Sequence, residues 1–313
     1  MIMGKIIRIG TRESQLAVWQ ASAVQDLLSK SGFNGELVHI KSEGDIDLVT
    51  PLYEIGVQGI FTRSLDAALL SGKIDLAVHS LKDVPTQLPE GITQAAVLKR
   101  GPVSDVVVFK NEQARSKYES SITDYPFTVA TSSIRRKAQW LNKFPSHVIR
   151  NLRGNVNTRL RKLQEENWDA AIFAQAGLER IDLRPQNSLV VDWMLPAPAQ
   201  GAIVVVCRVD DNYSFAACER FNDRETEICT KIERDFLRRL LGGCSTPISA
   251  LAQMNNTSVL FRGNIFSLDG SDKVEIEKSG DVENAGTLGR KAAEELLEQG
   301  GAEIAENIRH ATK

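Results

Sequence analysis

The stretch KIDLAVHSLKDVP, residues 73–85, leads from a buried strand into charged residues. Its apolar run over 73–81 predicts a strand covered on both faces, and Pro85 stops the hydrogen-bonded ladder. Lys82 and Asp83 therefore stand at the carboxyl end of that strand, which is where open α/β sheets bind ligands. A carboxylate beside a cation tends to stay ionised, which suits an acid or base in a site. Position alone leaves a second interpretation open, a solvated turn.

Strands and helices alternate on both sides of this stretch. Apolar residues recur with the strand period in KIIRIG (5–10) and ELVHI (36–40), and with the helical period after Ser14. A second series of the same kind runs through residues 127–177. Such alternation is typical of βα units around a largely parallel sheet. The sequence therefore predicts an α/β fold with two lobes of this kind.

The last third of the chain has a different pattern. A helix predicted over residues 223–241 ends at Gly242 and Gly243, as helices commonly do. Antiparallel strands are predicted on either side of the Asp-Gly turn at 269–270, followed by a final helix. This order predicts a smaller α+β domain at the C-terminus. The proline-rich LPAPAQG (195–201) is predicted to be a connector.

Composition restricts the class of protein. The chain has 313 residues, 42% hydrophobic and 25% charged, the values of a soluble globular protein with two or three domains. No apolar run is long enough to cross a bilayer, no secretory signal is recognisable, and four cysteines are too few for a disulfide scaffold. We therefore expect a cytoplasmic protein with no membrane partner. Its net charge of −2 argues against a surface built to hold nucleic acid.

A basic stretch nevertheless occupies the middle of the chain. Residues 125–164 contain nine Lys or Arg and no Asp or Glu. Ser132 and Ser133 are predicted to begin a helix there, with Arg135 and Arg136 in its first turn. Helix N-termini and guanidinium groups both bind carboxylates or phosphates, so we expect an anion at this point. The alternatives are a solvated basic face or a nucleic-acid surface, although interleaved aromatic residues for stacking are few.

Cys244 stands in the turn LLGGCSTPIS (240–249), directly after two glycines. This position gives a thiol backbone freedom and access to a ligand, as a reacting thiol requires, but a lone loop cysteine can also be incidental. The four histidines are scattered and no cysteine lies at metal-ligand spacing from them, so no metal site is expected. His79, inside the buried strand, is predicted to be a core histidine with its hydrogen bonds satisfied. The sequence contains no phosphate-binding glycine motif of a nucleotide site.

Seven motifs, in this order, carry a resemblance to a known family: TRESQLAVWQ (11–20), AVHSLKDVP (77–85), TSSIRRKAQ (131–139), LRGNVNTRL (152–160), AQAGLERI (174–181), LPAPAQGA (195–202) and GGCSTPI (242–248). Together they span nearly the whole chain and resemble hydroxymethylbilane synthase, also called porphobilinogen deaminase. The resemblance implies two lobes like those of periplasmic binding proteins, formed by residues 1–100 with 201–219 and by residues 101–200. A third, smaller α+β domain, residues 220–313, would carry a cofactor loop.

The resemblance also implies a reaction. The family joins four porphobilinogen molecules head to tail, releases ammonia and frees 1-hydroxymethylbilane, a transferase reaction of tetrapyrrole and heme biosynthesis. It uses a dipyrromethane cofactor held by a thioether to a cysteine that matches Cys244. Asp83 matches the catalytic aspartate, which would assist departure of the amine and stabilise the positive charge that forms. The family further suggests a monomer.

Each pyrrole of the family's substrate carries an acetate and a propionate, so the matching binding positions are mostly basic or hydroxyl side chains. Matching cofactor-binding positions are Lys82, Thr131, Ser132, Arg135, Arg136 and Arg159. Matching substrate-binding positions are Arg12, Ser14, Arg153, Arg180 and Gln200. The sequence departs from the family pattern elsewhere, at Gln58, Ala199, Val206 and Leu241. The alternative is a non-enzymatic two-lobed binding protein for an anionic small molecule, which would explain a basic cleft but not Cys244.

Overall fold

The computed structural model describes residues 5–41, 62–121, 126–240 and 246–311. Cys244, Gln58 and Leu241, on which expectations were placed, lie outside the described residues. Proximity of Cα atoms divides the chain into two units. Unit 1 comprises Met1–Asp47, Val57–Gly101 and Gly201–Ile228, and unit 2 comprises Leu48–Gly56, Pro102–Gln200 and Cys229–Lys313.

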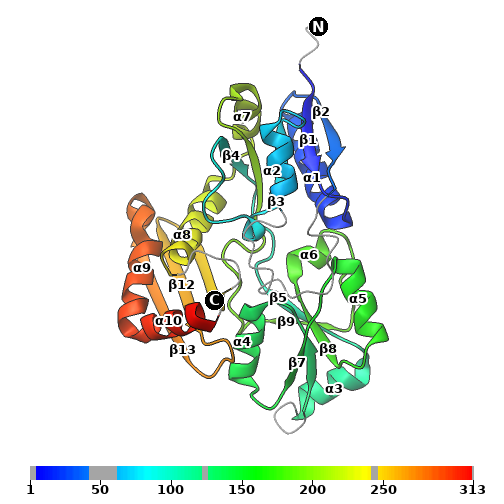
Figure 1. Cartoon of the computed structure of the whole chain (residues 1–313), viewed down its shortest axis with the longest axis vertical. Coiled ribbons are helices and arrows are strands. Elements are labelled where there is room, and N and C mark those ends of the chain that lie inside the picture. The colour runs from blue at the N-terminus through cyan, green and yellow to red at the C-terminus, as the bar shows by residue number, and fades with distance from the viewer. Residues whose placement is uncertain (1–4, 42–61, 122–125, 241–245, 312–313) are drawn as a thin grey trace. The chain divides into compact units, whose positions relative to one another are not determined.

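Unit 1 is built on a five-stranded sheet (Figure 1). In spatial order the strands are β2 (Gly35–His39), β1 (Ile7–Thr11), β3 (Leu76–Ser80), β10 (Ile203–Arg208) and β4 (Ile92–Val97). The helices are α1 (Gln15–Lys30), α2 (Arg63–Leu70), the 3₁₀ helix η2 (Leu81–Asp83) and α7 (Asn212–Glu219). β2, β1 and β3 are parallel, whereas β10 runs antiparallel to both of its neighbours. The three parallel strands therefore end at one edge of the sheet.

Apolar residues at helical spacing attach α1 to this sheet. Ala21, Val24 and Leu28 share one face of α1 and are fully buried in one cluster with Ile7 and Ile9 of β1. Removing this surface from water stabilises the pairing of helix and sheet. It also fixes the start of α1 directly beyond the end of β1.

Unit 2 contains a second five-stranded sheet of related design. In spatial order its strands are β7 (Val148–Arg150), β6 (Thr128–Ala130), β8 (Ala170–Ala174), β5 (Asp105–Phe109) and β9 (Ser188–Val191). Its helices are α3 (Glu112–Ser121), α4 (Ile134–Lys143), α5 (Val156–Glu165) and α6 (Gln175–Glu179). β7, β6 and β8 are parallel, and β5 runs antiparallel to β8 and β9. Because of this reversal, Asp105 at the start of β5 pairs with Ala174 at the end of β8.

Unit 2 also includes a three-stranded antiparallel sheet, β11 (Ile248–Asn255), β12 (Ser258–Phe266) and β13 (Lys273–Asp281), with β12 central. The associated helices are α8 (Arg224–Leu240), which belongs to unit 2 from Cys229 on, η3 (Val282–Thr287), α9 (Leu288–Leu296), the π-helix η4 (Leu297–Gly301) and α10 (Ala302–Ala311). α9 and α10 lie along this sheet (Figure 1). A Cβ at Gly289 would lie 2.0 Å from the carbonyl oxygen of Ile232, so α8 and α9 approach each other as only glycine permits.

The β12–β13 turn docks on α4. The Asn142 side-chain amide donates a 2.8 Å hydrogen bond to the carbonyl oxygen of Gly270. Gly270 has φ +81°, and a Cβ there would lie 2.3 Å from the carbonyl oxygen of Ala138. Earlier on α4, Gln139 donates to Ser249 of β11 at 2.9 Å. The helix that carries Arg135 and Arg136 in its first turn is thus held by the C-terminal sheet.

The expected α/β class is confirmed, with two sheet-containing lobes and a smaller C-terminal sheet. The sequence patterns do not predict β4, β9 or β11, and all three lie at a sheet edge, where a strand is paired on one side and needs a less regular apolar pattern. The boundaries 1–100 with 201–219, 101–200 and 220–313 stay a prediction. No helix in the described part of the chain has both the length and the apolar character that a membrane crossing requires.

Candidate active site

The carboxyl edge of the unit 1 sheet brings together residues distant in the sequence. Arg12 directly follows β1, and Ser14 caps α1 by accepting a 3.4 Å hydrogen bond from the Ala17 amide. Asp83 lies in η2, immediately after β3. Because β1 and β3 are adjacent and parallel, Arg12, Ser14 and Asp83 all line one pocket. Lys82, the neighbour of Asp83, is half-buried and is not among the pocket-lining residues.

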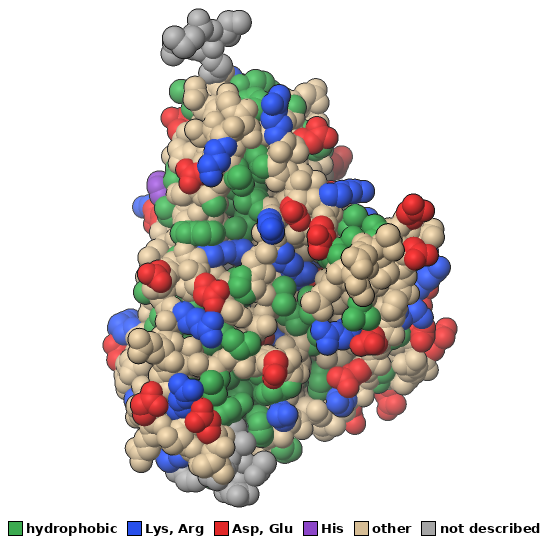
Figure 2. Space-filling view, turned by 180° about the vertical axis from the view of Figure 1, so that it is seen from behind, with side chains coloured by type: hydrophobic (Ala, Val, Ile, Leu, Met, Phe, Trp, Pro, Cys, Tyr) green, Lys and Arg blue, Asp and Glu red, His purple; other side chains and the backbone are tan. Residues whose placement is uncertain are grey.

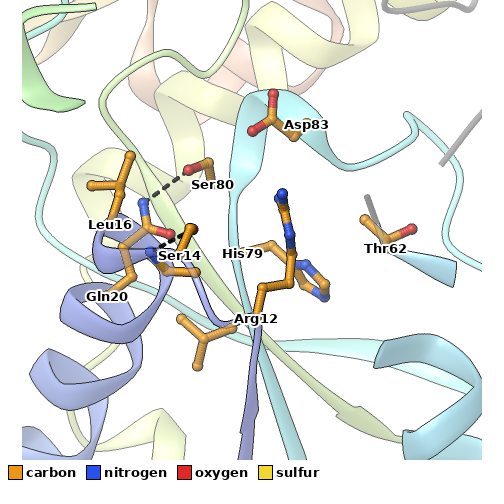
Figure 3. Close-up of a pocket in the computed structure, with 10 residues that line it drawn as sticks. Arg12, Ser14, Leu16, Gln20, Thr62, His79, Ser80 and Asp83 are labelled. Carbon is orange, nitrogen blue, oxygen red and sulfur yellow. Dashed lines mark hydrogen bonds between the residues drawn. The ribbon is translucent and has the colours of Figure 1, made fainter. Parts of the chain in front are cut away.

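The pocket has a volume of about 80 Å³ and is mostly polar. Its lining residues are Arg12, Ser14, Leu16, Ala17, Gln20, Thr62, Val78, His79, Ser80 and Asp83. Figure 3 shows the Arg12 side chain extending toward Asp83. The buried Gln20 donates a 2.8 Å hydrogen bond from its side-chain amide to Ser80, which joins α1 to the end of β3. The pocket therefore has a fixed wall of hydrogen-bonded side chains and a cation beside a carboxylate.

His79 differs from its predicted role. It is buried in β3 as expected, but its Nε2 has no hydrogen-bond partner among the residues that the structure describes, so the prediction of a satisfied core histidine is wrong. Burial lowers the pKa of His79 to about 4, and the nearby charge of Arg12 acts in the same direction. The imidazole is therefore neutral at physiological pH and lies in the wall of the pocket.

In unit 2 the paired arginines of the basic stretch converge on one buried acid. Arg135 donates to Asp105 at 2.7 Å, and Arg136 donates to it from Nη2 at 2.8 Å and from Nε at 3.2 Å. Asp105 is 0% exposed, and each arginine is 5% exposed. Gln200, also fully buried, donates from its side-chain amide to Asp105 at 3.0 Å and to the Val103 carbonyl oxygen at 2.6 Å.

Two guanidinium groups thus share one carboxylate. Burial would raise the pKa of Asp105, but the charges of Arg135 and Arg136 outweigh burial and hold that pKa well below its usual range. The remaining Arg136 nitrogen donates to the Ile172 carbonyl oxygen, whereas the buried Nε of Arg135 has no partner within the described ranges. Asp105 thus neutralises one of the two cations, and the cluster keeps an excess of positive charge. The binding of a further anion here stays a prediction.

Other predicted binding residues surround the ends of β6 and β7. Thr131 accepts from the Ser133 amide at 3.2 Å, and Ser132 accepts from the Leu152 amide at 2.9 Å. Arg159 donates to the Gly154 carbonyl oxygen at 2.7 Å. The Ser132 hydroxyl thereby links the two strand-to-helix turns, whereas Thr131 bonds within its own turn. Arg153 lies in the second of these turns.

Several arginines of unit 2 are turned inward and do not form a solvated basic face. Arg153 is buried like Arg135 and Arg136, and burial lowers the pKa of Arg180 to about 10. On the face drawn in Figure 2, acidic and basic side chains are interspersed. The charge of the basic stretch is thus directed partly to the interior, as expected of a site for a small anion.

Sequence reasoning misses Asp105 and the unsatisfied nitrogen of His79. Asp105 lies outside the basic stretch, 30 residues from Arg135, and only the reversed direction of β5 brings the two together. The available signal is an acid opening an otherwise apolar strand, DVVVF, in a chain with a local surplus of cations. For His79, the signal is a titratable side chain in an apolar strand that leads into the predicted site.

Comparison with known proteins identifies the family of the chain. Residues 7–215 match the family model described as porphobilinogen deaminase, dipyromethane cofactor binding domain, and residues 227–298 match that of the porphobilinogen deaminase C-terminal domain. The chain is 40% identical over 315 residues to the porphobilinogen deaminase of Chlorobium phaeobacteroides (strain BS1), covering 98% of this chain and 99% of the relative. For that of Pelotomaculum thermopropionicum the identity is 41% over 311 residues, covering 98% of each. The chain belongs to the porphobilinogen deaminase family.

Solved structures with a similar fold include the methionine binding protein MetQ, at 16% identity and a TM-score of 0.43, covering 71% of this chain and 92% of that one. A domain of Bordetella pertussis BvgS matches at 12% identity and a TM-score of 0.42, covering 69% and 85%.

Membership of the porphobilinogen deaminase family confirms the resemblance carried by the seven motifs. It makes the chain an enzyme of the transferase class and disfavours the non-enzymatic binding protein. The family's cofactor is a dipyrromethane. The Asp105 cluster fits such a group, since surplus positive charge and the unpaired Nε of Arg135 suit carboxylate side chains.

Proposed function

We propose that this chain condenses four porphobilinogen molecules head to tail, with release of ammonia, to give 1-hydroxymethylbilane for tetrapyrrole biosynthesis. One observation carries the proposal furthest. In a chain of this family, the pocket at the end of β3 presents the Asp83 carboxylate together with the Arg12 guanidinium. A carboxylate can follow the positive charge of the reacting pyrrole, and a guanidinium can fix one of its carboxylate arms.

In unit 1, Asp83 is the proposed catalytic residue. Its carboxylate accepts hydrogen bonds from pyrrole N–H groups and stabilises the positive charge that develops as the amine leaves. Arg12 and Ser14 hold a substrate carboxylate in the same pocket. The fixed position of η2 directly after β3 keeps Asp83 in reach of that substrate.

The proposed cofactor residues are Cys244, as the thioether anchor, with Lys82, Thr131, Ser132, Arg135, Arg136 and Arg159 binding its carboxylates. When bound, the dipyrromethane supplies the nucleophilic pyrrole carbon from which the product chain grows. Arg135 offers its unused Nε to a carboxylate, and Asp105 keeps both arginines oriented. Arg153, Arg180 and Gln200 are the proposed further positions for substrate carboxylates. We further propose a cytoplasmic monomer that acts on a small molecule and needs neither nucleic acid nor a membrane.

The intact mass of the purified protein tests both the anchor and the reaction. We expect wild type to exceed its sequence mass by two porphobilinogen units less two ammonia, and Cys244→Ser to show no excess. If wild type is unmodified, incubation with porphobilinogen should add that mass. A protein that gains none and releases no linear tetrapyrrole would contradict the proposal.

Asp83→Asn should largely abolish turnover, by roughly 100-fold or more, because positioned acid–base groups contribute factors of that order. The cofactor mass should stay attached. A matched control is Asp210→Asn, since that carboxylate is 84% exposed and lies outside the pocket. Steady-state rates of the two variants give the comparison. Normal turnover by Asp83→Asn would show that the role belongs to another group.

A further inference from the structure

His79 combines burial with an unsatisfied nitrogen at the edge of the pocket. Its side chain is 6% exposed, and in the described part of the chain Nε2 has no hydrogen-bond partner. A buried nitrogen without a partner destabilises a folded protein, so such groups in native proteins call for a bound molecule that satisfies them. Since the imidazole lines the pocket, that molecule would be one that enters it.

The pocket has room for part of a substrate. Its volume of about 80 Å³ is several times the roughly 10–15 Å³ that one water molecule needs by the same measure. A short arm that ends in a carboxylate therefore fits this space.

The charges around His79 favour an anionic arm. Arg12 follows β1, the strand adjacent to β3, and its charge acts on His79. The other polar residues of the lining are Ser14, Gln20, Thr62, Ser80 and Asp83 (Figure 3). A guanidinium attracts a carboxylate, and a carboxylate oxygen can only accept hydrogen bonds. The neutral imidazole has one N–H, so it serves this ligand best with the proton on Nε2.

We propose that His79 is a further substrate-binding residue, whose Nε2–H donates a hydrogen bond to the same substrate carboxylate that Arg12 pairs with. The inference rests on the proposed function and adds a residue to its substrate site. Two donors on one carboxylate fix the direction of the arm, and with it the placement of the ring against Asp83. His79 is then a binding group and transfers no proton.

Two substitutions separate binding from proton transfer. His79→Leu keeps much of the volume and removes the donor, whereas His79→Gln keeps an N–H close to the position of Nε2. A hydrogen bond to a charged group corresponds to roughly a 10- to 100-fold effect, so His79→Leu should raise KM for porphobilinogen by that factor. We expect kcat to change by less than about threefold, the pH profile of kcat to be unchanged, and His79→Gln to recover most of the loss.

Substrate analogues identify the arm. One analogue has the acetate shortened to methyl and another has the propionate shortened to ethyl, and each is assayed as an inhibitor. For the analogue that lacks the contacted carboxylate, wild type and His79→Leu should bind equally. For the other analogue the difference between the two proteins should persist. An unchanged KM and unchanged inhibition in His79→Leu would mean that Nε2 is satisfied by a water molecule, and would overturn the proposal.

Nitrogen-15 NMR of the histidine-labelled full chain provides a readout that needs no turnover. The resonance missing from His79→Gln assigns His79, which should be the Nε2–H tautomer. Its Nε2–H signal should shift on adding a porphobilinogen analogue with methyl in place of aminomethyl, which has both carboxylates and no leaving amine. The opposite tautomer, or a fall in kcat with a shifted pH profile in His79→Leu, would overturn the inference. A wild type that binds this analogue but never consumes porphobilinogen would instead refute the proposed function.

Discussion

Two buried aspartates in different parts of the chain each pair with two arginines, and the two clusters have different roles. In unit 1, Asp75 accepts from Arg8 at 2.9 Å and from Arg208 at 3.4 Å. In unit 2, Asp105 accepts from Arg135 and Arg136 at 2.7 and 2.8 Å. Both carboxylates are almost completely buried. The difference lies in what surrounds the arginines.

Around Asp75 the cations reach water and meet a second acid. The side chains of Arg8 and Arg208 are 36% and 20% exposed, and Arg208 also donates to Asp211 at 3.1 Å. Around Asp105 the two arginine side chains are 5% and 6% exposed and share that one carboxylate. An exposed, balanced ion cluster joins structural elements. A buried cluster with surplus charge and an unused donor is typical of a ligand site.

Removal of the aspartate charge should give the largest difference in stability between the two clusters. Asp105→Asn preserves shape but leaves two buried guanidinium groups without a counter-ion, and loss of a partner from a buried ion pair lowers the free energy of unfolding by about 3–5 kcal/mol. Asp75→Asn should lower it by only about 1–2 kcal/mol, because Arg8 and Arg208 can be solvated instead. Urea unfolding of both variants measures the difference. A larger loss in Asp75→Asn would show that exposure does not distinguish the clusters.

The pH dependence of stability should sharpen the comparison. The two arginines lower the pKa of Asp105 despite its burial. The ionised carboxylate therefore contributes fully to the free energy of unfolding at pH values above its unfolded-state pKa of about 4. That contribution is lost as the pH falls toward the native pKa. Between about pH 4 and pH 3, the unfolding free energy of wild type should therefore fall by up to about 1.4 kcal/mol per pH unit more than that of Asp105→Asn.

The pKa of Asp75 is also lowered, because the hydrogen bonds from Arg8 outweigh the effect of burial. The effect of salt on the pH dependence of stability should distinguish the two aspartates. At about 1 M salt, where charges are screened beyond about 3 Å, the slope difference should shrink for Asp75→Asn and persist for Asp105→Asn. Unfolding free energies measured over the same pH range at low and high salt make this test. Equal salt sensitivity would mean that the Asp105 cluster is as accessible to ions as that of Asp75.

The two clusters also show what the sequence could predict. Residues that follow a strand directly, such as Arg12 and Asp83, are placed by local pattern alone, since parallel strands end at one edge. The α/β class and the helix start before Arg135 follow from the same local signals. The pairing of Arg135 with Asp105 does not follow from local signals, because it depends on the direction of β5 within the sheet. Pairing across a sheet is a property of topology, which periodicity does not encode.

His79 and Gln200 illustrate a second limit. Local pattern shows that His79 is buried but not whether its ring nitrogen has a partner, which depends on the neighbouring strand and helix. The family resemblance marks Gln200 as a binding position, yet its amide is bonded to Asp105 and the Val103 carbonyl oxygen. Burial can be predicted from composition, whereas satisfaction of a particular polar atom requires coordinates.

The smallest change in stability should come from the connector before Gln200, the residue that donates to Asp105. Ala199 has φ +62°, where the family pattern has glycine, and its amide donates at 2.6 Å to the buried Glu233, which also accepts from Ala252. Ala199→Gly should relieve about 1–2 kcal/mol of left-handed strain, while the freer unfolded chain offsets about 0.4–1 kcal/mol. We therefore expect the free energy of unfolding to rise by about 0–1.6 kcal/mol. Ala197→Gly, at an ordinary φ in the same connector, should instead lower it by about 0.5–1 kcal/mol. Thermal unfolding of both variants decides the sign, and a loss of stability in Ala199→Gly matching that in Ala197→Gly would mean that the bond to Glu233, and not the backbone angle, limits this turn.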